Sequence, residues 1–303
     1  MPTPAPLNQP QLELCFSASA RGETYLSRQL GGYPYHVGRL LPNAVVGAPK
    51  AQVIIQSSSG GIFENDRLHQ RFTVHDGAAA QVNTAASTIV HTMTGGRAVS
   101  IITIEVGANA RLDYLPQPTI LFPHCELFNQ IDLTLHPGAT VLLSDAYLTH
   151  DPSGRDQTLK DLTTQITIRD AHGRVRARDR FVLTALAMRA GGVGGIKQTQ
   201  QSWRAHGGLL VLKLDEPDLA ADDTLAARLN RALQADPSPA GATASAASAP
   251  ACYAGAGTLP GHCGTFVRML AHDGLNLQRA LQTALETSRL TLPPCSRPTA
   301  TPG

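Results

Sequence analysis

The chain has 303 residues and a mass of 32.0 kDa, which is enough for one large hydrophobic core. Hydrophobic residues make up 42% of it and charged residues 16%, so a chain that is disordered throughout is excluded. With 25 Lys and Arg against 23 Asp and Glu, the net charge is only +2, which disfavours a nucleic-acid partner. No stretch reaches about 18 consecutive apolar residues and the N-terminus does not resemble a leader, so we expect a soluble, cytoplasmic protein with no membrane partner.

Five cysteines are scattered along the chain: Cys15, Cys125, Cys252, Cys263 and Cys295. An odd number of widely spaced cysteines in a chain of this size predicts reduced thiols rather than disulfide bonds. No CxxC motif occurs, and a metal site at the nearest pair, Cys252 and Cys263, is the alternative.

Apolar and polar residues alternate from about residue 50 to residue 185, and this period of two is typical of β-strands. Three segments in this region repeat one pattern: a strand, a turn with a glycine, and a second strand. The turn glycines, Gly77, Gly107 and Gly138, lie 30 and then 31 residues apart, and a weaker fourth copy begins at Ile166. Each unit predicts an antiparallel hairpin with its glycine in the turn.

Repeated hairpins must stack on one another or form facing sheets, because a single hairpin cannot cover its own apolar face. The expected fold class is therefore mainly β, with stacked antiparallel hairpins in a β-solenoid-like or two-sheet body. A doubly wound α/β fold would need amphipathic helices between the strands, and a period of about 30 residues leaves no room for them.

Two helices are expected in the C-terminal third, near 222–234 and 273–288, where leucines recur every four residues after a capping Asp or Thr. Residues 236–251 between them are almost entirely Ala, Ser, Pro, Gly and Thr, which predicts a mobile surface loop. We expect one mainly-β domain over residues 11–292, with loose tails at 1–10 and 293–303.

The densest candidate for a functional segment is SSSGGIFENDRL at 57–68, which follows a predicted strand. Its paired glycines, Gly60 and Gly61, let the backbone approach a ligand or another chain, and a corner between two strands is the alternative. The segment is not a phosphate-binding loop, and no G-x-S-x-G pattern occurs. None of the eleven histidines forms an H-E-x-x-H or H-x-H motif.

Two further segments have unusual composition. Residues 115–123, LPQPTILFP, set a short strand between prolines, which predicts an edge strand that cannot pair further. Residues 83–88, NTAAST, carry small polar side chains where a half-buried strand would favour large ones. Such side chains can line a wet interior, and ordinary tight packing is the alternative.

The order and spacing of these segments resemble the urease accessory protein UreD family, also called UreH. The resemblance is carried by GGIFEND at 60–66, TAAST at 84–88 and LPQPTILF at 115–122. It runs from about residue 26 to 186 and returns at GTFVRML, 264–270. The chain departs from the family pattern at Glu64 and Asn65, where glycines are usual, and it lacks the usual Arg-x-Trp near the C-terminus.

The resemblance implies a mainly-β scaffold that is not an enzyme. It implies a complex with UreF and the GTPase UreG on apo-urease, through which nickel reaches the urease active site. Nickel would be in transit and not a tightly bound cofactor, and an internal water-filled passage would carry it. Carried over by position, the lining of that passage is expected to include Asp66, Ser87, Thr88, Asp145 and Asp179. Carboxylate and hydroxyl oxygens can replace part of a divalent ion's hydration shell and still release the ion.

Two other classes of function stay open from the residues alone. A hydrolase or lyase on a β-solenoid-like body would need paired carboxylates on one face, and Asp66 and Asp145 are the available pair. A stand-alone nickel-binding chaperone would bind the ion tightly. A pocket with two facing carboxylates would favour the enzyme, whereas a narrow passage through the body would favour the scaffold.

Overall fold

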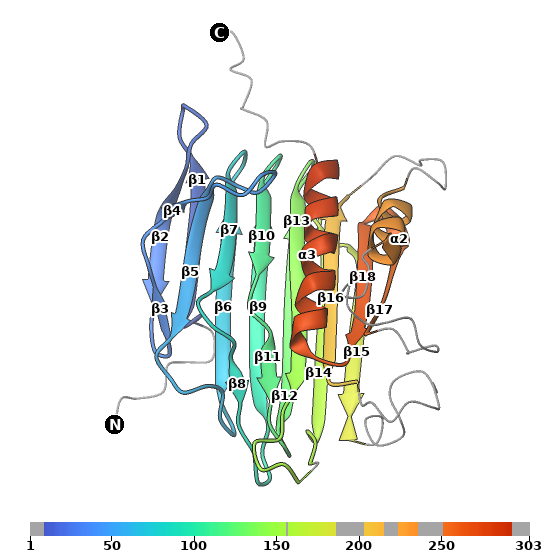
Figure 1. The fold of residues 1–303 in the computed structure, drawn as a ribbon. Coiled ribbons are helices and arrows are strands. Elements are labelled where there is room, and N and C mark those ends of the chain that lie inside the picture. The colour runs from blue at the N-terminus through green and yellow to red at the C-terminus, as the bar shows by residue number, and fades with distance from the viewer. Residues whose placement is uncertain (1–8, 156, 186–202, 215–223, 236–250, 293–303) are drawn as a thin grey trace.

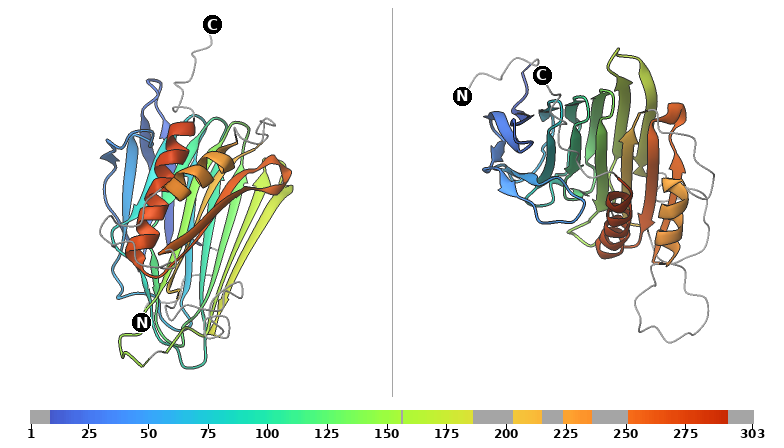
Figure 2. Two further views of the ribbon diagram at one scale, coloured as in Figure 1. Left: turned by 45° about the vertical axis from the view of Figure 1, so that its right-hand side comes forward. Right: turned by 90° about the horizontal axis from the view of Figure 1, so that it is seen from above.

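The structure, a computed structural model, describes residues 9–155, 157–185, 203–214, 224–235 and 251–292. Two β-sheets face each other, and two helices cover the outer face of one of them (Figure 1 and Figure 2). The predicted loop at 236–251, apart from its last residue, lies outside the described residues. Most of the predicted N-terminal tail and all of the C-terminal tail also lie outside them.

Each sheet has a simple spatial order. The seven-stranded sheet runs β15 (Val175–Thr184), β14 (Asp161–Asp170), β12 (Glu126–Leu135), β9 (Ala98–Val106), β6 (Arg67–Val74), β1 (Leu12–Ala18) and β2 (Thr24–Gly31). The eleven-stranded sheet runs β17 (Cys252–Thr258), β18 (Gly264–Ala271), β16 (Ala205–Lys213), β13 (Thr140–Thr149), β10 (Arg111–Leu115), β7 (Ala79–Thr84), β5 (Ala51–Ser57) and β3 (Tyr35–Val37). The short strands β4 (Leu41–Pro42), β8 (Ile89–Val90) and β11 (Thr119–Leu121) join the second sheet at its side.

The repeated unit crosses from one sheet to the other at its glycine turn. β6, β9 and β12 lie side by side and parallel in the seven-stranded sheet. Their successors β7, β10 and β13 lie side by side and parallel in the eleven-stranded sheet. The mainly-β, solenoid-like two-sheet body is thus confirmed. Gly77 and Gly138 lie in their turns at positive φ, as predicted, whereas Gly107 begins its turn and Asn109 has the positive φ there.

The antiparallel pairing predicted for these three units is wrong, because the two strands of each unit face each other across the core. A strand, a tight turn and a second strand give the same alternating pattern whether the strands pair edge to edge or pack face to face. Only the weaker fourth copy, β14 and β15, forms the predicted antiparallel hairpin, with Gly173 in its turn at φ 78°. The alternation of apolar and polar residues indicates which face of a strand points inward. It does not indicate which other strand is its hydrogen-bonded neighbour.

The turns stack on one another and hold successive units in register. The Asp76 carboxylate of the first turn accepts a hydrogen bond of 2.7 Å from the Ala108 amide of the next. A Cβ atom on Gly107 would collide with Asp76, so this close approach requires glycine there. The short strand β11 is also more enclosed than predicted, since β8 pairs with one side of it and β13 with the other.

The two sheets differ in how many of their faces are covered. β12 alternates between buried and half-buried residues, because one face of its sheet packs on the core and the other meets solvent. β13 is buried over nearly its whole length, because the helices α2 (Leu225–Ala235) and α3 (Gly274–Thr291) cover its second face. The leucine-spaced helices are confirmed, and Thr224 and Asp273 cap their first turns. Within the described residues, no helix is long and apolar enough to cross a membrane.

A buried ionic cluster fixes the end of α3 to the eleven-stranded sheet. Asp113 of β10 is fully buried, and its carboxylate contacts Arg111 at 2.8 Å and Arg289 of α3 at 3.3 Å. The Arg289 guanidinium also donates to the Gln81 side chain on β7 at 2.9 Å. Burial raises the pKa of Asp113, and both guanidiniums oppose that rise. No local pattern in the sequence indicated this cluster, since Asp113 and Arg289 lie far apart in the chain.

Candidate functional site

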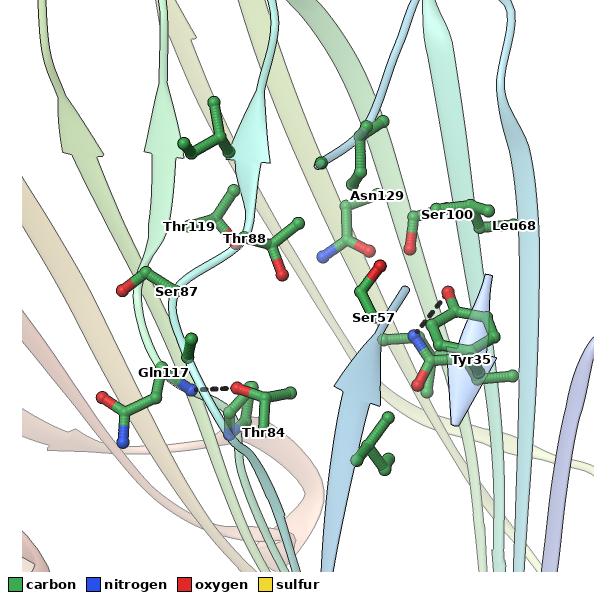
Figure 3. A pocket seen from close by; sticks show the side chains of 18 of the residues that line it. Tyr35, Ser57, Leu68, Thr84, Ser87, Thr88, Ser100, Gln117, Thr119 and Asn129 are labelled. Carbon is green, nitrogen blue, oxygen red and sulfur yellow. Dashed lines mark hydrogen bonds between the residues drawn. The ribbon is translucent and has the colours of Figure 1, made fainter. Parts of the chain in front are cut away.

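A cavity of about 490 Å³ lies between the two sheets, beside the apolar core. Inward-facing residues of β6, β9 and β12 form one wall, and residues of β5, β10 and β13 form the other. Figure 3 shows the polar ends of Ser57, Thr88, Ser100 and Asn129 directed into the space between these strands. The candidate site is therefore a chamber between the sheets, lined by apolar side chains and by hydroxyl and amide groups.

The chamber exists because the inward-facing residues change character along the strands. In β9 the inward Ser100 lines the chamber, and Ile104 further along the same face is buried in the core. Asn129 is the register partner of Ser100, and Leu133 is the register partner of Ile104. We call the apolar part of the space between the sheets the packed half, and the part around the chamber the hollow half.

The Gly60-Gly61 pair lines the chamber and brings its loop against the neighbouring strand β8. Gly61 has φ 141°, and a Cβ atom there would collide with the Ile89 carbonyl oxygen and the His91 ring. The Ile62 amide donates to that same carbonyl oxygen at 2.7 Å. The close approach that these glycines permit is thus to the protein's own backbone, which supports the structural alternative for this motif.

Glu64 and Asn65, where the chain departs from the family pattern, each have a clear local role. Asn65 has φ 67°, a left-handed conformation that asparagine tolerates better than most residues other than glycine. The Glu64 carboxylate accepts hydrogen bonds from the Thr94, Gly95 and Gly96 amides and from the Thr94 hydroxyl. These bonds lower the pKa of Glu64 to about 2.

The five residues expected to line a passage do not all gather at the chamber. Ser87, Thr88 and Asp145 line it. Asp66 does not, because its carboxylate turns back to accept a 2.8 Å hydrogen bond from the Phe63 amide and so closes its own loop. Asp179 lies on β15, outside the residues that line the chamber, and reaches Asp145 only through a shared arginine.

That arginine is Arg268 of β18, which bridges the two sheets. It contacts Asp145 of β13 at 3.2 Å and also pairs with Asp179 of β15 in the opposite sheet. Asp145 is nearly buried, at 6% side-chain exposure, whereas Arg268 is 30% exposed. Burial raises the pKa of Asp145, and the guanidinium beside it opposes that rise. We call these three residues the ionic triad.

A second cavity, of about 380 Å³, lies next to the triad, with Asp145 and Arg268 in its lining. Asp145 and Tyr147 line both cavities. The second cavity also contains Phe181, His206 and Arg268 in its lining, and the Phe181 and His206 ring centroids are 5.8 Å apart. His206 is almost fully buried and its Nε2 atom has no hydrogen-bond partner.

Sequence reasoning missed several residues that shape these cavities. Ser100 and Asn129 interrupt an otherwise apolar inward series, and this interruption was a signal that could have found them. Arg268 and His206 gave no comparable signal, because both act through neighbours that are distant in the sequence.

The cysteines do not form a metal site in the described part of the chain. Cys263 packs in the core between the sheets, whereas Cys252 packs on the helix-covered side, so the pair is not brought together. Burial raises the pKa of the Cys125 thiol to about 12. Across the described residues, no group of three or more His, Cys, Asp or Glu side chains could hold a metal ion.

The carboxylate pair required by the enzyme alternative is also not assembled. Asp145 lines the chamber and is paired with Arg268, whereas Asp66 lines neither cavity. A mechanism with two facing carboxylates therefore has no support at this pair.

Fold and site together define a solenoid-like, two-sheet protein with a chamber between its sheets that is lined by apolar side chains and by hydroxyl and amide groups. The model of the family described as UreD urease accessory protein matches residues 8–300. "Urease accessory protein UreD 1" of Pseudomonas syringae pv. syringae is 33% identical over 273 residues, which is 89% of this chain and 88% of the relative. The protein of that name from Methylorubrum extorquens is 30% identical over 295 residues, 97% of this chain and 92% of the relative. The chain belongs to the UreD urease accessory protein family, which confirms the resemblance carried by its motifs.

Proposed function

We propose that this chain is a non-catalytic scaffold for urease maturation, and that it acts with UreF and UreG on apo-urease to bring nickel to the urease active site. The observation that carries the proposal is the chamber between the sheets, with the hydroxyl and amide groups in its lining. Family membership supports the urease part of the proposal, and the chemistry of the chamber supports the nickel part.

The chamber has the donor set expected of a conduit rather than of a storage site. Its hydroxyl and amide oxygens can each replace a water ligand of a divalent ion, but neutral oxygens bind Ni²⁺ weakly. A conduit must bind weakly enough to release. Asp145, the one carboxylate among the described residues of the lining, is already paired with Arg268, so it does not trap the ion in this arrangement.

A scaffold must also present apolar surface to its partners. Val46 is 78% exposed and Leu290 is 80% exposed. The Val46 loop and the end of α3 touch, because Gly47 packs against Arg289. Exposed apolar residues of this kind favour partner contact, so we expect the chain alone to self-associate and co-expression with UreF to keep it in solution.

The test of the conduit is to fill the chamber. Ser100→Phe places a bulky ring in the hollow half, and Thr103→Phe places the same ring on the outer face of the same strand as the matched control. Each variant is expressed with urease and the other accessory proteins; the complex is recovered by pull-down and the nickel content of purified urease is measured. We expect Ser100→Phe to assemble normally and load little nickel, with Thr103→Phe close to wild type. Full nickel loading by an assembled Ser100→Phe complex would overturn the conduit.

A further inference from the structure

The two cavities are neighbours separated by a thin partition. Asp145 and Tyr147 line both of them, and Arg268 lines the second and pairs with Asp145. An ion that moves from the chamber to the second cavity along this shared wall therefore passes Asp145 and the guanidinium paired with it. The passage that the proposed function requires would be closed at this point by a charged side chain.

The triad holds a positive charge where a cation would otherwise sit. The Arg268 guanidinium lies between the carboxylates of Asp145 and Asp179, which come from opposite sheets. It repels an approaching divalent ion and at the same time occupies the oxygens that would bind that ion. Arg268 is 30% exposed and lines the second cavity, so its side chain has room to move while Asp145 stays buried.

A buried histidine, His206, lines the second cavity next to the triad. Tyr147 and His206 are register partners on β13 and β16, and Asp145 lies two residues from Tyr147 on the same face. Burial lowers the pKa of His206 to about 4, so the imidazole is neutral near pH 7. The Nε2 atom of His206 has no hydrogen-bond partner but is closed off from the cavity in this arrangement, so it can offer its lone pair to a metal ion only after the ring turns.

We propose that the ionic triad is a gate between the two cavities, that Arg268 must swing out of it for a divalent ion to pass, and that His206 receives the ion in the second cavity. The gate rests on the proposed function, because it regulates the same conduit. An imidazole favours Ni²⁺ over Mg²⁺, so His206 would also select the cargo at this step.

Gly208 supplies a way to disturb the gate without removing a charge. A Cβ atom at Gly208 would collide with both the Arg268 guanidinium and the Asp145 carboxylate, so Gly208→Ala pushes the ion pair apart. Gly255→Ala is the matched control, since Gly255 lines the same cavity and has nothing within 4 Å of its added Cβ.

The experiment measures binding of NiCl₂ to the full-length chain by equilibrium dialysis. Arg268→Met frees two carboxylates from their cation, so we expect Ni²⁺ affinity to rise about tenfold or more. Gly208→Ala should raise it by a smaller factor, and Gly255→Ala should not change it. Adding His206→Phe to Arg268→Met should remove part of the gain for Ni²⁺ and none of the gain for Mg²⁺.

Other outcomes separate the gate from the conduit. Unchanged Ni²⁺ affinity in folded Arg268→Met and Gly208→Ala overturns the gate, and so does a gain that His206→Phe leaves intact for both metals. If Arg268→Met does not fold, Gly208→Ala decides the question because it keeps all three charges. Nickel loading of urease by the wild-type chain tests the proposed function separately, and its failure would leave the affinity comparison valid.

Discussion

The space between the sheets is packed in one half and hollow in the other, although the same strands build both. In the packed half, Phe72, Ile104 and Leu133 are almost fully buried. In the hollow half, the same faces of these strands present Leu68, Ser100 and Asn129 to the chamber. The ladders of backbone hydrogen bonds run without interruption from one half to the other.

This difference shows that the hydrogen-bonded pairing of the strands does not depend on how tightly the side chains pack between the sheets. The hydrogen bonds of a parallel ladder satisfy the backbone N–H and C=O groups whatever the side chains are. A continuous strand can therefore have a cavity beside part of its inward face. The packed half supplies the burial that stabilises the fold, and the hollow half is left available for the chamber. Substitutions in the two halves should therefore have different consequences, and four predictions follow that contrast.

The largest loss of stability is expected outside both halves, at the buried ionic cluster beneath α3. Its charged groups are packed against one another and do not line a cavity. Asp113→Ala leaves the Arg111 and Arg289 guanidiniums buried without their carboxylate, which should cost about 3–5 kcal/mol of unfolding free energy. Urea unfolding measures it. Arg28→Ala, which removes the exposed partner of the part-buried Glu13, is the control and should cost less than about 1 kcal/mol. Equal losses would show that the cluster is not closed to solvent.

The next effect compares one substitution in the two halves. Leu133→Ala removes a fully buried side chain from the packed half, and we expect it to cost about 3 kcal/mol of unfolding free energy. Leu68→Ala removes the same atoms from a part-buried position on the chamber wall, and should cost less than half as much. Denaturant midpoints at constant m-value measure both. A Leu68→Ala loss as large as that of Leu133→Ala would contradict the division into halves.

The packed half could be predicted from the sequence, whereas most of the hollow half could not. Period-two alternation identified the strands, and the repeat of Gly77, Gly107 and Gly138 identified the turns, because both are local properties of the chain. The pairing of strands was predicted incorrectly. Two strands joined by a tight turn show the same alternation of apolar and polar residues whether they pair edge to edge or face each other across the core. The ionic triad was out of reach, because Asp145, Asp179 and Arg268 meet only through the arrangement of two sheets.

A smaller effect is expected from pH at the second cavity, next to the hollow half. The pKa of His206 is lowered to about 4 in the fold against 6.5 without burial, so the unfolded chain takes up a proton first as pH falls. The stability that the neutral imidazole gives is complete above about pH 6.5 and is lost progressively towards pH 4. His206→Phe should therefore lose about 2 kcal/mol less than wild type between pH 7 and pH 4.5. Parallel stability curves for the two proteins, from urea unfolding at each pH, would contradict this.

The smallest effect is expected at Asn129, a polar residue of the chamber wall. Asn129→Ala removes one hydrogen bond of 3.2 Å to the Tyr147 hydroxyl, which keeps its 2.7 Å bond to Thr164, so the loss should be about 0.5 kcal/mol. In a Thr164→Val background the same change should cost clearly more, because the Tyr147 hydroxyl then has neither partner. A double-mutant cycle by urea unfolding measures this coupling. Strict additivity would mean that the hydroxyl is satisfied from within the chamber, and the hollow half would then be wet at this point as well.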